Sequence, residues 1–135
     1  MSFDIFLNCY DENGESETFP FALIEREFGP FAAARAAKWW DLIDPDGGRC
    51  ELYVDATEAT IGHFMVASPP VHIAFWQSIL NLLQRTPSCL HWPGGGPVIA
   101  QAFVRDHLPQ YMIEGLGEPK IVSTPEQILQ AIRDS

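Results

Sequence analysis

Residues able to carry chemistry are present in this 135-residue chain, but each group lacks part of the pattern that its chemistry needs. The run Gly94-Gly95-Gly96 would let backbone amides approach a phosphate closely. It lies between Pro93 and Pro97, and it has neither the lysine nor the glycine spacing of known phosphate loops. We therefore interpret the run as a structural or binding loop.

Nucleophile and metal arrangements are also incomplete. Cys89 and His91 are two positions apart and would share a face of a strand, as a thiol and its base require. The same alternation is typical of a core strand, so a buried structural thiol is favoured. A metal site needs three or four converging ligands. The histidine spacing provides no such convergence, and neither a metal nor another cofactor is predicted from His63, His72, His91 and His107.

Carboxylates gather around the turn Asp44-Pro-Asp-Gly-Gly48, which resembles the start of a calcium loop. The sixth loop position is Arg49 where glycine is needed, and the twelfth is Asp55 where glutamate is needed. Calcium binding is therefore a minor hypothesis. A pair of hydrolytic carboxylates has no local signature. A hydrolytic pair therefore remains a possible interpretation of Asp44, Asp46, Asp55 and Glu58. The simpler interpretation is that these residues form the solvated tip of a hairpin.

The adjacent tryptophans Trp39 and Trp40 are a candidate binding feature. Neighbouring residues of a strand face opposite sides, so one tryptophan should fill the core. The other should meet a second layer, the surface or a partner. An exposed tryptophan beside carboxylates would be an anchor for protein binding.

Acidic charge is concentrated in the first part of the chain. The net charge is -10, and residues 1–60 hold 13 acidic and 4 basic side chains, against 5 and 4 in residues 61–135. Such a field repels nucleic acid and anionic membranes, and it accelerates encounter with cationic partners. Solubility alone is the alternative reason for this charge.

Composition predicts one folded domain over residues 1–135, because 47% of the residues are hydrophobic. Three widely spaced cysteines, Cys9, Cys50 and Cys89, do not form a disulfide framework and are predicted to be buried thiols of a reducing compartment. The beginning of the chain has no signal-peptide pattern, and no apolar run is long enough to span a bilayer. We therefore expect a soluble cytoplasmic protein.

Residue periodicity predicts both strands and helices. Alternation indicates a strand at 2–10, a hairpin over 39–55 and strands at 61–67, 89–92 and 121–122. Helical spacing indicates a short helix from Pro20, a core helix carrying Trp76 and a terminal helix begun by a capping box at Thr124. Residues 31–38 could form a helical turn, and 98–104 fit either state. Without a regular βαβ rhythm, the prediction is a single-domain α+β fold, a mostly antiparallel sheet packed by about three to four helices.

Several motifs resemble those of a group of small bacterial proteins. They are the opening Met1 to Phe6, Phe28-Gly-Pro-Phe31, Phe64 to Pro70, Trp92 to Pro97 and His107-Leu-Pro109, so the likeness spans most of the chain. The resemblance implies no catalytic residues. In size and charge, such proteins are similar to immunity proteins, which neutralise a cognate toxin by covering its active site.

The leading hypothesis is a non-enzymatic binding protein, an immunity-type inhibitor that neutralises a basic protein toxin. Charge would steer association, and an aromatic anchor, Trp39 or Trp40, would set the residence time. The predicted partner-binding carboxylates are Glu12, Glu15, Glu17, Asp44, Asp46, Asp55 and Glu58.

Two rival hypotheses belong to other classes. The first is a small enzyme or ligand-binding domain with a pocket near the glycine run, formed by His91, Trp92, Gly94, Gly95, Gly96 and His107. The second is a homodimer that pairs through residues 98–104 or through the tryptophans.

Overall fold

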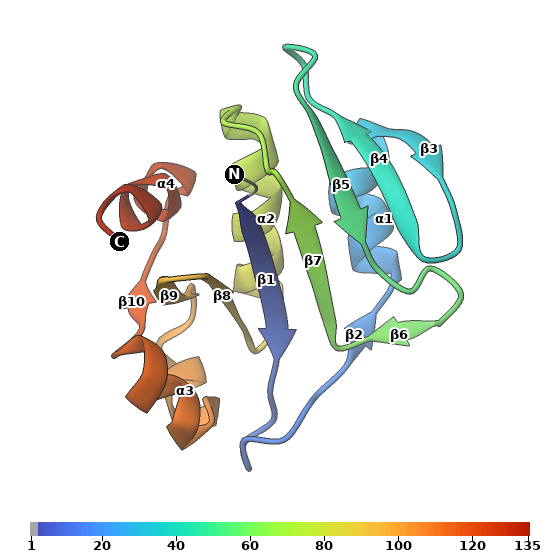
Figure 1. The fold of residues 1–135 in the computed structure, drawn as a ribbon. Helices are drawn as coiled ribbons and strands as arrows, with labels where there is room; N and C mark the ends of the chain where they lie inside the picture. The colour runs from blue at the N-terminus through green and yellow to red at the C-terminus, as the bar shows by residue number, and fades with distance from the viewer. Residues whose placement is uncertain (1–2) are drawn as a thin grey trace.

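One mixed sheet organises the chain (Figure 1). The computed structural model describes residues 3–135, so Met1 and Ser2, which belong to the predicted opening strand and motif, lie outside the described residues. Within them the sheet has eight strands in the order β10-β9-β8-β1-β7-β5-β4-β3. Its strands are β1 Asp4–Cys9, β3 Ala32–Arg35, β4 Trp39–Ile43, β5 Arg49–Tyr53, β7 His63–Ala67, β8 Ser88–Trp92, β9 Gly95–Ile99 and β10 Lys120–Ile121.

Strand pairing is antiparallel throughout this sheet except at one edge, where β10 runs parallel to β9. A separate two-stranded ladder joins β2 Phe19–Pro20 to β6 Thr60–Ile61. The helices are α1 Ala22–Phe28, α2 Ile73–Arg85, α3 Gln110–Leu116 and α4 Pro125–Arg133, with short 3-10 segments at Gly29–Phe31 and Ala102–His107. The α+β class and the mostly antiparallel sheet are thereby confirmed.

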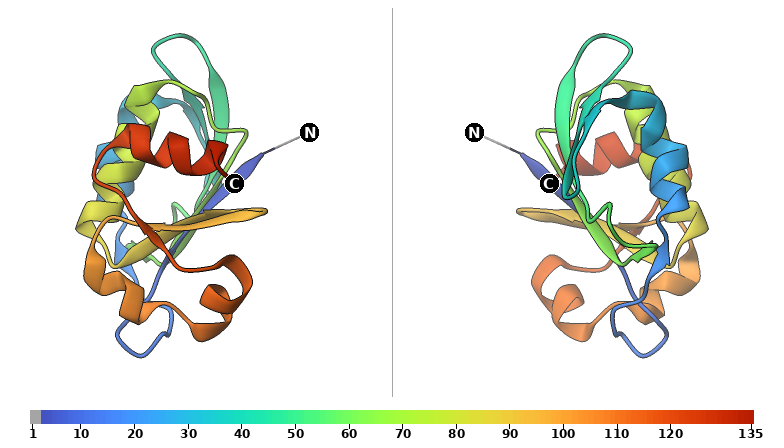
Figure 2. Two further views of the ribbon diagram at one scale, coloured as in Figure 1. Left: turned by 90° about the vertical axis from the view of Figure 1, so that its left-hand side faces the viewer. Right: turned by 90° about the vertical axis from the view of Figure 1, so that its right-hand side faces the viewer.

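The main core lies between one face of the sheet and a layer of helices. Figure 2 shows α1 and α2 on the same side of the sheet, and α4 extends this layer beside α2 and over β9. Strand β1 sends Ile5 and Leu7 into this core, and both are fully buried. The predicted core helix is confirmed, with Trp76 only 2% exposed.

The opposite face of the sheet is covered only in part. Helix α3 packs against β9 on that side, over a smaller core formed by Tyr10, Cys89, Ile99, Val104, Leu108 and Met112. Strands β1, β7, β5 and β4 alternate between buried residues on the helix side and partly or fully exposed residues on the other. We call the uncovered part of these four strands, together with the adjoining part of β8, the open face.

Two local predictions were wrong, and both involve short segments. Residues 31–38 contain β3, because pairing with β4 and an ion pair between Arg35 and Glu25 at 2.7 Å overcome the helix preference of alanine. Pro20 belongs to β2, and the first helix begins at Ala22.

Other local predictions are confirmed. The 39–55 hairpin is β4 and β5, and the capping box of α4 joins Thr124 and Gln127 reciprocally. The unassigned segment 98–104 is divided between β9 and a 3-10 turn. Its Val98, Ile99 and Val104 are fully buried within this chain, whereas Phe103 of the same segment is 51% exposed.

All three cysteines are free and buried, as predicted. Burial raises the pKa of these thiols, to about 11 for Cys9 and about 12 for Cys50 and Cys89. They are therefore protonated at neutral pH and poor nucleophiles. No helix within residues 3–135 is long and apolar enough to cross a membrane.

Candidate functional site on the open face

A row of mainly aromatic side chains crosses the open face from strand to strand. Trp39 on β4 is opposite Tyr53 on β5, which is opposite Met65 on β7. Met65 is opposite Phe6 on β1, and Phe6 is opposite His91 on β8. Directly opposed residues bring their Cβ atoms to within about 5 Å. These five side chains therefore form one continuous strip, which we call the aromatic row.

The aromatic row is accessible along much of its length. Trp39 and Tyr53 are 40% and 39% exposed. Phe6, Met65 and His91 are half-buried. At the other end, the rings of Phe6 and His91 are stacked with centroids 5.4 Å apart. The row thus offers an apolar, pre-ordered surface of the kind that anchors protein partners.

A second row of cross-strand neighbours carries negative charge. Two positions along each strand from the aromatic row, Asp41 is opposite Glu51, Glu51 is opposite Ala67, and Ala67 is opposite Asp4. We call these four residues the acidic row. Three of them, Asp41, Glu51 and Ala67, line a hollow of about 410 Å³. Arg49 lines the same hollow and places one positive charge at its far side.

The two rows are linked by a hydrogen bond. The Tyr53 hydroxyl donates to Glu51, and this bond raises the pKa of Tyr53. One carboxylate oxygen, Oδ1 of Asp4, is buried without a hydrogen-bond partner within the described chain.

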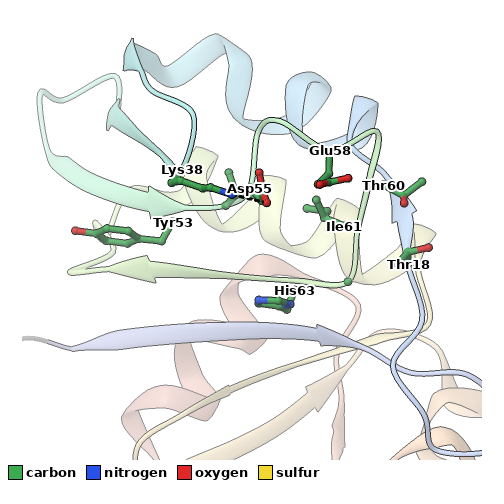
Figure 3. Close-up of a pocket in the computed structure, with 10 residues that line it drawn as sticks. Thr18, Lys38, Tyr53, Asp55, Glu58, Thr60, Ile61 and His63 are labelled. Atoms are coloured by element: carbon green, nitrogen blue, oxygen red, sulfur yellow. Dashed lines mark hydrogen bonds and ion pairs between the residues drawn. The ribbon is translucent and has the colours of Figure 1, made fainter.

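A pocket of about 360 Å³ adjoins the open face where β5 continues toward β6 (Figure 3). Lys38 contacts Asp55 there, with Nζ 2.7 Å from Oδ2. Hydrogen bonds from Lys38 and Thr57 hold the pKa of Asp55 at about 2. Glu58 and His63 line the same pocket from other segments. Because Asp55 stays ionised and paired, it is poorly suited to act as the general acid of a carboxylate pair.

A larger hollow of about 540 Å³ lies beside α3 at the other end of the aromatic row. It is lined by Phe6, Asn8, Tyr10, His91, Trp92, Pro93, Gly94, Tyr111, Met112 and Leu116. The His91 ring nitrogen Nε2 lies 3.1 Å from Oδ1 of Asn8, and burial lowers the pKa of His91. Tyr111 is 70% exposed and forms part of the rim. The hollow is therefore aromatic, with few polar groups.

His91 should titrate below the ordinary histidine value of about 6.5. Because its folded pKa is lowered, its contribution to stability is present above about pH 6.5 and is lost as the pH falls below that value. Proton NMR of the histidine rings, with His91→Gln to assign the signal, would measure the pKa directly. The wild type should lose more stability than His91→Gln between pH 7.5 and 5.5, and a pKa above 6.5 would contradict the burial of the ring.

The structure does not bring the predicted partner-binding carboxylates together. Glu12, Glu15 and Glu17 are exposed in the loop after β1, whereas Asp46 is exposed at the tip of the β4–β5 hairpin. Only Asp55 and Glu58 share a pocket. These groups lie at separate places, and Asp46 lies 3.7 Å from His72 at the start of α2, so they do not form one contact site.

Two of the predicted contact residues are structural. Trp40 is only 2% exposed and lies under the guanidinium of Arg35, so Trp39 is the exposed member of the pair. Asp44 is 9% exposed, and its Oδ1 accepts the backbone N–H groups of Asp46 and Gly48 at 2.8 and 2.9 Å. This carboxylate stabilises the hairpin turn, as aspartate commonly does.

The predicted pocket at the glycine run is divided between two hollows. Gly94, Gly95, Gly96 and Trp92 line one of about 230 Å³ that reaches Ser135, whose Oγ accepts the Trp92 indole N–H at 3.1 Å. His91 belongs to the hollow beside α3. His107 lines neither hollow, because its Nδ1 lies 3.0 Å from the Tyr10 carbonyl and its ring contacts Phe103. The hollow beside α3 nevertheless brings three of the predicted residues together, because His91, Trp92 and Gly94 all line it.

Sequence reasoning missed Tyr111 on α3 and most of the open-face residues, which are Asp4, Phe6, Asp41, Glu51, Tyr53 and Met65. One signal was available, because the strand beginning near residue 3 carries Phe6 and Asn8 on the face opposite its apolar one. An aromatic residue on a half-polar strand face indicates a surface that binds something or is covered by another element. The other members of the row come from strands whose order the local pattern does not reveal.

Comparison with protein-family models, with curated proteins and with solved structures found no match for this chain. Among residues 3–135, no three histidine, cysteine, aspartate or glutamate side chains are placed to hold a metal ion. The geometry of the open face is therefore the basis for a functional proposal.

Proposed function

We propose that this chain is a non-enzymatic binding protein whose open face receives a basic protein partner. The observation that carries the proposal is the aromatic row beside the acidic row on an uncovered part of the sheet. Aromatic side chains supply contact area at low entropic cost, and they attract cationic groups through their ring faces. The adjacent carboxylates favour the same cationic partner.

The particular binding protein that we propose is an immunity-type inhibitor acting in the cytoplasm. A net charge of -10 would accelerate encounter with a basic toxin. Exposed carboxylates such as Glu15, Asp46 and Glu58 would contribute chiefly to the rate of association. The aromatic row would govern dissociation, because desolvated anchors determine most of the residence time.

A site-specific crosslinking experiment tests this proposal. A photoreactive residue, p-benzoylphenylalanine, would replace Met65 at the centre of the aromatic row. The matched control would carry it at Gln77, which is exposed on α2 in the helix layer. Irradiation in native cell extract at low salt should link one basic protein to the Met65 variant and not to the Gln77 variant.

Two further measurements test whether the crosslink depends on the aromatic row and on charge. Adding Trp39→Ala and Tyr53→Ala to the Met65 variant should remove the crosslink, and about 0.5 M salt should weaken it because charge attraction is screened. A crosslinked acidic protein, equal capture by the Gln77 variant, or no product at Met65 would each overturn the proposal.

The hollow beside α3 favours a second candidate, a small-ligand-binding domain. Its volume of about 540 Å³ lies in the range of ligand sites, and its lining is aromatic with few polar groups. A ligand there would be planar and apolar, recognised by Phe6, His91 and Tyr111. Failure of the Met65 crosslink, together with a thermal shift by an aromatic compound that Tyr111→Ala removes, would favour this candidate.

A further inference from the structure

We infer that the partner segment on the open face is a basic amphipathic α-helix that lies along the aromatic row, across the strands. This inference rests on the proposed function and adds the secondary structure and the charge pattern of the partner. It follows from three features of the face: the direction of the row, its spacing and the side on which the acidic row lies.

The first feature is that the row is built from interior strands. Strands β4, β5, β7, β1 and β8 each have a neighbour on both sides, so their backbone groups are engaged within the sheet. A partner strand adds to a sheet through the free backbone groups of an edge. The open face therefore offers side chains alone, and recognition depends on how the side chains of the partner are spaced.

The second feature is the spacing along the row. Neighbouring strands are about 4.8 Å apart, so the four steps from Trp39 to His91 span roughly 19 Å. A helix presents one contact per turn, about every 5.4 Å, whereas an extended chain presents same-side residues about every 6.7 Å. After four steps a helix is displaced from the row by about 2 Å and an extended chain by about 8 Å. A helix of roughly 13 residues thus stays in register with all five side chains.

The third feature is the asymmetry of charge beside the row. The acidic row lies on one side, about 7 Å away along the strands, and includes Asp4, Asp41 and Glu51. On the other side, His63 and Asn8 are cross-strand neighbours. Two carboxylates, Asp55 and Glu58, line the pocket there, and Asp55 is paired with Lys38. A matching helix carries an apolar stripe with arginine or lysine on one flank. Arg49 repels cations placed beyond the acidic row, which confines the basic residues to that flank.

The His91 end of the aromatic row also favours a helix that lies along the row. Beyond Phe6 and His91 the surface falls into the hollow beside α3, whose rim includes the exposed Tyr111. A terminal apolar side chain of the helix fits this hollow. The helix would then have an anchor at one end, with Trp39 beneath the other.

Designed peptides test the helix directly. The probe is a 14-residue peptide with a leucine stripe at helical spacing and arginines along one flank. Its control has the same sequence with two central residues in the D configuration, which removes the helix while composition and charge stay unchanged. Binding would be measured by fluorescence anisotropy, and its location by NMR shifts of the Trp39 indole and the backbone amides of Tyr53 and Phe6.

We expect the all-L peptide to bind with shifts along the aromatic row and the diastereomer to bind at least tenfold more weakly. Tyr53→Ala should weaken binding of the all-L peptide about tenfold. The matched control Val71→Ala removes an apolar side chain that is 86% exposed outside the row and should leave binding unchanged. A peptide with glutamate in place of arginine should not bind.

Equal affinity of the two peptides, with loss on Tyr53→Ala, would overturn the helix and leave the binding of a basic partner intact. Absence of row shifts with either peptide would also overturn the helix. In that case a Met65 crosslink to a basic protein would still support the proposed function. Absence of the crosslink would overturn both the helix and the proposed function.

Discussion

Trp76→Ala is expected to lower the free energy of unfolding by about 3 to 5 kcal/mol, the range for truncating a large aromatic side chain in a packed core. Trp76 is 2% exposed and packs edge-to-face on Phe75, with ring centroids 5.1 Å apart. Its indole N–H also donates to the Pro70 carbonyl at 2.8 Å. Alanine leaves a cavity between α2 and the sheet and removes this hydrogen bond.

The matched control is Trp39→Ala, which removes the same side chain from the open face. Trp39 is 40% exposed, so the loss should be below about 1 kcal/mol. Urea unfolding followed by far-UV circular dichroism measures both variants without depending on tryptophan fluorescence. Similar losses for the two variants would show that Trp39 is part of the core, and the aromatic row would then be unsuitable as a binding surface.

Gly96→Ala should be unusually damaging for so small a substitution, with a loss of about 3 kcal/mol or more. Gly96 has a φ of +88°, where a Cβ atom is strained. An added Cβ would also lie 2.9 Å from the Cα of His91, across the β8–β9 hairpin. The backbone would have to move, and the Phe6–His91 end of the aromatic row would move with it.

Gly94→Ala separates strain from steric conflict. Gly94 has a φ of +84°, yet an added Cβ meets nothing within 4 Å. This variant should lose only the strain, about 1 to 2 kcal/mol. Thermal unfolding of the pair measures the difference. If Gly96→Ala were as mild as Gly94→Ala, the close packing of β9 against β8 would be refuted, and a ligand-binding role for the glycine run would gain weight.

The sequence predicted those parts of the fold whose causes are local. Alternation placed Trp39 and Trp40 on opposite faces, and the Asp44 to Gly48 turn defined the hairpin between them and Tyr53. The capping box at Thr124 correctly marked the start of α4. In each case the residues that determine the structure lie within a few positions of one another.

The aromatic row could not be predicted in this way. Its members come from five strands spread from residue 6 to residue 91, and only the strand order makes them neighbours. That order depends on non-local pairing, such as β1 between β7 and β8, which no short window contains. The β3 error has the same origin, since alanines that favour a helix in isolation are held as a strand by β4 and by the contact of Arg35 with Glu25.

Helices α1, α2 and α4 complete the main core from one side of the sheet. The side chains of the open face therefore contribute little to the stability of the fold. Positions such as Tyr53 and Glu51 can change without opening a cavity, so mutation there can alter the preferred partner while the scaffold persists. Related chains could diverge in specificity along this face at little cost in stability. The same separation makes the sheet suitable as a starting point for engineered binders, with libraries randomised across β4, β5 and β7.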